Sequence, residues 1–311
     1  MNENPSVGGF SLFLSGFLLG FLLGFLLGLL LGLLLGLLSG FGRGFVAALS
    51  SVRSIHAQHP HARHLVMSNL WLHIVAIPSA GEHAAIARDE ARHAFGARRL
   101  NAGDHVTLFD GAGTIADAVL CDERGRDGSV LVEITARREE PRPSPETTIA
   151  FAVPKGDRLS TLLDLATQTG VARLVAIECA RSVVDADKLD RSERCQRIVA
   201  ESAKVAKRAW MPELATGGDL VAFVRTELAR GAAVAVAHTE DGAGAVRAGL
   251  LAWRSSLDAT QPRTVVIGPE GGFEPSELET LRTCGASFVS LGPCVMRVET
   301  AAVAAAVLLQ A

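Results

Sequence analysis

The sequence predicts two folded parts, a C-terminal α/β domain with a mostly parallel sheet and a small β-barrel before it. Beyond residue 147, short β-branched runs alternate with helical segments, which is the pattern of a parallel sheet. Between residues 105 and 134, short apolar runs are separated by glycine-containing turns, which predicts antiparallel strands. The length of 311 residues accommodates both domains.

The chain begins with an unusual segment, residues 7–42, which contains no charged residue. A glycine occupies every fourth position from Gly16 to Gly44, with Leu and Phe between. One interpretation is a membrane helix with small-xxx-small spacing, although a four-residue period drifts about 40° per step around a helix. The other is an upstream extension, with translation starting at Met67. We therefore treat residues 1–66 as an apolar extension followed by a His-rich linker, and both interpretations stay open.

Composition gives no sign of general nucleic-acid binding, of disulfides or of a metal site. The formal net charge of −3 gives no general nucleic-acid signature, so any RNA contact must come from local basic patches. None of the five cysteines lies in a C-x-x-C pair, which predicts a reduced, cytoplasmic protein without disulfides or a metal site. The histidines between residues 43 and 66 are interpreted as a solvated linker, and no metal is predicted.

The predicted barrel spans residues 67–146. A helix is predicted over 84–100, followed by strands over 105–109, 114–120 and 129–134. The proline-rich, charged stretch 139–146 reads as a linker, and it places the domain boundary at residue 146.

The α/β domain spans residues 147–311. Its predicted strands are 149–153, 174–177, 233–237, 264–267 and 288–291, and its predicted helices are 158–169, 189–208, 221–230, 276–284 and 299–310. The strand 264–267 breaks into Gly268-Pro269-Glu270-Gly271-Gly272-Phe273, and the strand 288–291 runs into Gly292-Pro293. Glycines after buried strands let a ligand approach the backbone, and small molecules bind where such strand ends meet. No dinucleotide-binding or P-loop motif is present, so the predicted ligand is not gripped by its phosphates.

These two loops, with Arg297-Val298-Glu299-Thr300-Ala301 after the second, resemble the C-terminal signature of the SPOUT methyltransferases, most closely the bacterial 16S rRNA uracil-N3 methyltransferases. The piece from His93 to Asp104 resembles the same family's N-terminal region, a PUA-like barrel that helps hold RNA. The resemblance implies a trefoil-knotted domain, a homodimer, S-adenosylmethionine as cofactor, and methylation of N3 of a uridine in the small-subunit rRNA of the 30S particle.

The resemblance also assigns site residues. Cofactor-binding positions are Ile267, Gly268, Pro269, Glu270, Gly271, Gly272, Leu291, Gly292, Val295, Met296 and Arg297. RNA-binding candidates are His93, Arg98, Lys155, Arg158, Arg181, Lys207 and Arg208. Alternatively, each of the isolated cations is a solvated surface charge without a binding role.

Arg297 and Glu299 are the catalytic candidates. The N3 proton of uracil must leave before or during attack on the methyl group, so a carboxylate can serve as base and a cation can stabilise the developing anion. Glu299 can equally be a first-turn carboxylate that offsets the helix dipole, worth under ~1 kcal/mol. Arg297 can equally hold a substrate phosphate.

The chain departs from the family pattern at Gln168, Lys204, Val205 and Cys294. These departures put the substrate in more doubt than the cofactor, because the cofactor loops bind mostly through backbone groups. Three alternatives follow: a SPOUT enzyme that methylates ribose 2′-hydroxyls, a non-catalytic RNA-binding protein, and a membrane-tethered protein if residues 7–42 are a membrane segment.

Overall fold

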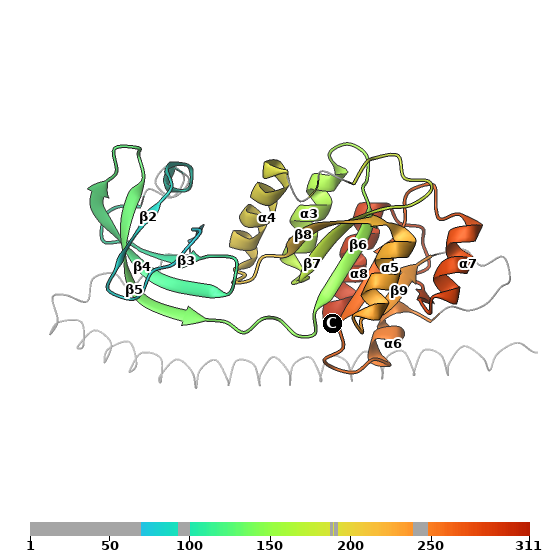
Figure 1. The fold of residues 1–311 in the computed structure, drawn as a ribbon. Coiled ribbons are helices and arrows are strands. Elements are labelled where there is room, and N and C mark those ends of the chain that lie inside the picture. The colour runs from blue at the N-terminus through green and yellow to red at the C-terminus, as the bar shows by residue number, and fades with distance from the viewer. Residues whose placement is uncertain (1–69, 93–99, 187–188, 190–191, 239–247) are drawn as a thin grey trace, which may run out of the picture. The chain divides into compact units, whose positions relative to one another are not determined.

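The computed structural model describes residues 70–92, 100–186, 189, 192–238 and 248–311. Residues 66–311 form one compact unit, in which two separate sheets are built from consecutive parts of the chain (Figure 1). Residues 1–66, with the predicted apolar segment 7–42, lie outside the described residues. Within the described residues, no helix is both long enough and apolar enough to cross a membrane.

The N-terminal sheet has the strand order β1-β3-β4-β5-β2. Its strands are β1 (Trp71–His73), β2 (His83–Ile86), β3 (His105–Phe109), β4 (Thr114–Arg124) and β5 (Val130–Glu139). β1 pairs with β3 in parallel, and the other pairs are antiparallel. Alternate side chains of β3, β4 and β5 point into one apolar core, which includes Leu108, Leu120 and Val132. The predicted strands 105–109, 114–120 and 129–134 are confirmed, since each lies in β3, β4 or β5 apart from Ser129.

One predicted element of this part is wrong at its start. The segment predicted as a helix over 84–100 begins as strand β2, and helical structure covers only residues 88–92 before the described part breaks off. Ala84 and Ile86 are buried in the core while Ala85 between them is exposed. The alternation covers only four residues, and its alanines are equally compatible with a helix, so the sequence predicted a helix here.

The C-terminal sheet has the strand order β11-β9-β10-β6-β7-β8, and every described pair is parallel. Its strands are β6 (Thr147–Ala152), β7 (Arg173–Glu178), β8 (Glu213–Asp219), β9 (Ala233–Ala237), β10 (Arg263–Ile267) and β11 (Ser287–Val289). The predicted α/β class with a mostly parallel sheet is confirmed. Parallel strands bring their carboxyl ends to one edge, so the loops after β6, β7, β9, β10 and β11 share that edge.

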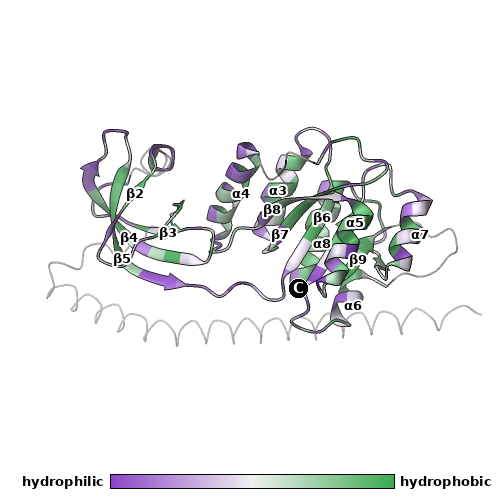
Figure 2. Cartoon of the chain, viewed as in Figure 1, coloured by the Kyte–Doolittle hydropathy of each residue, from purple (hydrophilic) through white to green (hydrophobic). Residues whose placement is uncertain are grey.

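Helices cover both faces of this sheet (Figure 1). They are α3 (Arg158–Gln168), α4 (Glu193–Ala206), α5 (Leu220–Ala229), α6 (Leu250–Ser255), α7 (Pro275–Thr283) and α8 (Val298–Gln310). Ile149 and Phe151 of β6 pack in the core shared with α3, α4, α6 and α8. Ala150 and Ala152 pack on the opposite face with α5 and α7. The central strands are therefore apolar on both sides, and the polar surface lies on the outer faces of helices such as α4 and α7 (Figure 2).

The predicted helices and strands of this domain match the observed ones closely, with two omissions. Strand β8 ends in Gly217-Gly218-Asp219, which reads as a turn, and helix α6 has only six residues. The long helix predicted over 189–208 is shorter, because Ser192 caps α4 by accepting a hydrogen bond from the backbone N–H of Cys195.

Candidate functional site

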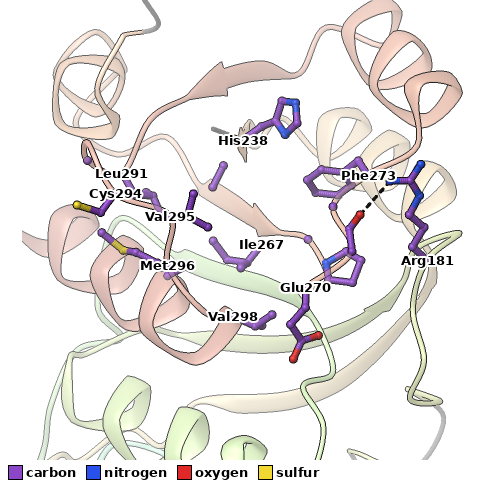
Figure 3. A pocket seen from close by; sticks show the side chains of 17 residues that line it. Arg181, His238, Ile267, Glu270, Phe273, Leu291, Cys294, Val295, Met296 and Val298 are labelled. Atoms are coloured by element: carbon purple, nitrogen blue, oxygen red, sulfur yellow. Dashed lines mark hydrogen bonds between the residues drawn. The ribbon is translucent and has the colours of Figure 1, made fainter. Parts of the chain in front are cut away.

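A cavity of about 290 Å³ lies at the carboxyl edge of the C-terminal sheet. The loop after β10 forms one wall, and the segment between β11 and α8 forms the other (Figure 3). The end of β9 lies between them, because β9 pairs with both β10 and β11. The volume is near the lower end of the roughly 300–1,000 Å³ that is typical of small-molecule sites.

Two glycines shape the first wall. A side chain at Gly268 would place its Cβ 2.6 Å from the ring of Phe273, so only glycine leaves room for that ring to fold back across the loop. Gly272 has φ +71°, a left-handed conformation that glycine adopts without strain. Its N–H donates to the carbonyl oxygen of Pro269 at 2.9 Å and closes a turn. The ring of Phe273 and this turn both constrain the backbone of the loop.

The structure brings the predicted cofactor residues together around this cavity. Those that line it are Ile267, Gly268, Pro269, Glu270, Gly271, Gly272, Leu291, Gly292, Val295 and Met296. Arg297 is the one predicted member that is not among the lining residues. The apolar walls and the backbone groups of two loops suit a ligand with an aromatic ring and polar edges.

Sequence reasoning did not assign several lining residues to this cavity; among them are His238 and Phe273, and also Arg181, which it had assigned to RNA. His238 follows β9, and its ring lies edge-on to Phe273 with centroids 6.1 Å apart. In Figure 3 both rings lie on the same side of the cavity. The sequence did carry a signal for His238, because this residue directly follows a strand that was predicted correctly. The order of the strands was needed to show that this strand lies between the two glycine loops.

Arg297 and Glu299 lie at the start of α8, where they follow the lining residues Met296 and Val298 in the sequence. Arg297 is exposed and caps the helix without a side-chain hydrogen bond. Glu299 does not line the cavity, and its Oε2 is buried without a hydrogen-bond partner. A buried carboxylate oxygen that lacks a donor is costly, and this atom has an unused capacity to accept a hydrogen bond.

The cations predicted to bind RNA differ in their surroundings. Lys155 and Lys207 are exposed, whereas Arg158 and Arg181 are held by the loop after β10. The guanidinium of Arg208 instead donates to the carbonyl oxygens of Thr167 and Val171, and burial lowers its pKa to about 10. Its contacts give Arg208 a structural role at the end of α3. His93 and Arg98 lie outside the described residues.

Two cysteines near the site have opposite character. Burial, reinforced by the charge of Glu277, raises the pKa of Cys179 to about 12, so this thiol stays neutral and unreactive near neutral pH. Cys294 is exposed and lines the cavity.

Comparisons with known proteins match this architecture. A profile of the RNA methyltransferase domain matches residues 140–310, and a profile of the RNA methyltransferase PUA domain matches residues 86–134. Ribosomal RNA small subunit methyltransferase E of Mycobacterium bovis is 33% identical over 247 residues, which cover 77% of this chain and 90% of that protein. The Bacillus subtilis protein of the same name is 26% identical over 221 residues, which cover 70% and 85% of the two chains.

Solved structures share the fold. One from Porphyromonas gingivalis has a TM-score of 0.65 at 28% identity, covering 76% of this chain and 95% of its own. Ribosomal RNA small subunit methyltransferase E from Neisseria gonorrhoeae, solved with S-adenosyl methionine, has a TM-score of 0.61 at 23% identity and covers 78% and 96%.

Proposed function

Because this chain belongs to the RNA methyltransferase family that includes the ribosomal RNA small subunit methyltransferases E, we propose that it transfers a methyl group from S-adenosylmethionine to N3 of a uridine in 16S rRNA. The observation that carries the proposal is the cavity between the loops after β10 and β11, which is lined by ten of the eleven residues expected to bind the cofactor. The 30S particle as substrate places this activity in the cytoplasm.

The residues present fit S-adenosylmethionine. Ile267, Phe273, Leu291 and Val298 supply apolar walls for the adenosine, and the backbone of the glycine loops supplies donors and acceptors for its polar edges. Gly268 has no side chain, which keeps the wall formed by Phe273 in place. When bound, the cofactor supplies an electrophilic methyl group on a sulfonium.

The reaction requires little of the protein beyond positioning and one proton transfer. We propose that the carboxylate of Glu299 takes the N3 proton and that Arg297 stabilises the negative charge that develops on the uracil. Both residues are sequence neighbours of residues that line the cavity, so we propose that the uridine enters from the side of the first turn of α8.

We propose that Lys155 and Lys207 contact rRNA phosphates, because both are exposed cations. Phosphate contacts of this kind position RNA without reading its sequence. The PUA domain matched at residues 86–134 would add a second RNA surface. His93 and Arg98 remain candidates there from the sequence alone, while the internal hydrogen bonds of Arg208 exclude it from our proposed RNA surface.

The proposal also includes a knot, a domain boundary and a dimer. We propose a trefoil knot in the C-terminal domain, with boundaries at residues 146 and 147 between the two parts of the fold. We propose a homodimer as well, because Leu165 of α3 and Val307 of α8 are about half exposed on two helices that pack together. No metal enters the proposed reaction.

Two measurements test the function. Calorimetry of the purified protein with S-adenosylmethionine should show one site per chain, and failure to bind would end the methyltransferase proposal. The protein should then methylate 30S particles from a strain that lacks the modification. Nucleoside mass spectrometry should place the methyl group on the base fragment of uridine. A methyl group on the ribose fragment would replace the proposal with 2′-O methylation, and cofactor binding without any methyl transfer would favour a non-catalytic RNA-binding protein.

A further inference from the structure

Arg181, which the sequence suggested as an RNA contact, lines the cavity and is engaged by the loop after β10. Its Nη1 donates a hydrogen bond to the carbonyl oxygen of Gly271 at 2.9 Å, shown as the dashed line in Figure 3. Its Nε lies 4.0 Å from a carboxylate oxygen of Glu274. The aliphatic part of Arg181 covers Gly271, where an added Cβ would lie 3.5 Å from the Cβ of Arg181. The side chain therefore packs along the loop that forms one wall of the cavity.

The neighbouring backbone reinforces this contact. The N–H of Ala180 donates to Oε1 of Glu277 at 2.8 Å, and the N–H of Glu274 donates to Oε2 of the same carboxylate at 2.7 Å. Glu277 therefore joins the loop after β7 to the loop after β10. Arg181 has a rigid base from which to reach Gly271.

A second arginine contacts the same loop. Arg158, at the start of α3, places Nη1 3.1 Å from Oε1 of Glu270. The loop after β10 is thus held at Glu270, at Gly271 and at Glu274 by residues that follow β6 and β7. Lys155 lies at the same sheet edge, and within the described part of the chain its side chain makes no ion pair or hydrogen bond.

From this geometry we propose that Arg181 is a positioning residue for cofactor binding, with Arg158 supporting it through Glu270. The inference rests on the proposed function and refines it. Gly271 and Gly272 give the loop many alternative conformations, and a charge-assisted hydrogen bond to the Gly271 carbonyl selects one of them. A loop that is already ordered binds its ligand without an additional ordering cost.

The proposal differs in a measurable way from the role that the sequence suggested. A phosphate contact would change RNA affinity and its salt dependence and would leave cofactor affinity without RNA unchanged. A positioning role would weaken cofactor affinity when no RNA is present. It would also raise KM for the cofactor while kcat at saturating cofactor stays close to that of the wild type.

The experiment measures S-adenosylmethionine affinity of the full chain by calorimetry without RNA. We expect Arg181→Ala to bind about ten-fold more weakly, and Arg181→Lys to recover part of the loss because an ammonium can still donate to Gly271. The matched control Lys155→Ala removes a cation from the same edge and should bind the cofactor as the wild type does. Hydrogen exchange of the free proteins should show faster exchange confined to residues 268–274 in Arg181→Ala.

Wild-type cofactor affinity in Arg181→Ala would overturn the inference while leaving the proposed function intact. If Arg181→Ala loses its cooperative melting transition, the affinities of Arg181→Lys and Glu270→Gln for S-adenosylmethionine test the inference instead. Wild-type affinity in both of these variants would overturn it. A wild-type protein that binds no S-adenosylmethionine would end the proposed function and this inference with it.

Discussion

Gly268 and Phe273 illustrate what single residues contribute to the site. The glycine after β10 was predicted as a point of close ligand approach, and it lines the cavity as expected. The structure adds a second reason for the glycine, because the ring of Phe273 occupies the place of its missing side chain. The sequence shows that Gly268 has no side chain, but it does not show which neighbouring side chain occupies that space.

The contacts of charged residues are even harder to predict from the sequence. Arg158, Arg181 and Arg208 looked alike in the sequence, as cations near strand or helix ends. In the structure Arg158 and Arg181 hold the loop after β10, and Arg208 donates to backbone carbonyls. The partners are 37 to 112 positions away in the chain, so no local pattern reveals them.

At the residue scale, the role proposed for Glu299 predicts a specific kinetic result. Glu299→Gln removes the proton acceptor but keeps the shape of the side chain, so the rate of methyl transfer should fall by about 100-fold or more. Cofactor affinity should not change, because Glu299 does not line the cavity. Single-turnover methylation of 30S particles at saturating S-adenosylmethionine measures the rate.

The exposed neighbour Thr300, changed to Ala, serves as the control within the same helical turn. A Glu299→Gln protein that keeps full turnover with intact cofactor binding would rule out the base role. Glu299 would then be a first-turn carboxylate at the positive end of α8.

At the scale of elements, strands β6, β7, β9 and β10 were predictable because each is a short run rich in β-branched residues or alanine and largely buried on both faces. Strand β9 was predicted with the observed ends, Ala233–Ala237. Strand β8 was not predicted because its end, Gly217-Gly218-Asp219, has the composition of a turn, although Gly218 and Asp219 pair with Ile177 and Glu178. Tertiary pairing overrides local preference there. The order of the strands, and hence the place of His238 between the glycine loops, is a property that no single element encodes.

The opposite edge of this sheet is held together by a buried carboxylate. Glu227 of α5 is 2% exposed and accepts hydrogen bonds from Arg173 at 2.9 Å, Arg230 at 2.7 Å and Thr264 at 2.6 Å. Burial alone would raise the pKa of Glu227, yet the donors outweigh it and the pKa is lowered from the ordinary value of 4.5. Glu227 thereby joins α5 to β7 and β10.

Glu227→Gln should lower the free energy of unfolding by about 3 kcal/mol at pH 7, because it leaves two arginines without their buried counter-charge. The lowered pKa means that the folded protein binds this proton less readily than the unfolded chain. The contribution is therefore complete above the unfolded pKa near 4.5 and is lost as the pH falls through the folded pKa.

Urea denaturation of the wild type and the variant at several pH values measures this difference. The two free energies should converge as the solution becomes acidic. Glu279→Gln, which breaks an exposed pair with Arg282, should have almost no effect. A constant gap between wild type and Glu227→Gln down to the lowest pH would show that the charge of Glu227 is not what stabilises the fold.

At the scale of the whole described unit, the N-terminal sheet and the α/β domain share a packed boundary. Phe109 and Ile115 of that sheet form one apolar cluster with Ala203 and Ala209, and Trp210 packs over Gly113, whose Cβ would lie 2.5 Å from its ring. The sequence marked Lys204 as a departure that put the substrate in doubt, but it could not show what the lysine contacts.

Lys204 joins the two parts by an ion pair. Its Nζ lies 2.8 and 2.9 Å from the two carboxylate oxygens of Glu90, and only 8% of the lysine side chain is exposed. Because the pair is largely removed from water, the two charges should be coupled by about 1 to 3 kcal/mol. The pair fixes how the RNA-binding part is presented to the catalytic part, so its loss should raise KM for the 30S particle and leave cofactor affinity unchanged.

A double-mutant cycle with Lys204→Met and Glu90→Gln measures the coupling. Each single change should destabilise the protein to urea and raise KM for the 30S particle several-fold, and the double variant should be little worse than either single one. Arg197→Met removes an exposed cation from the same helix and should change neither quantity. Additive effects on stability would show that Lys204 and Glu90 act independently. An unchanged KM for the 30S particle in all three variants would show that this ion pair does not position the RNA, and the recognition of the substrate would then have to reside in the loops at the carboxyl edge of the sheet.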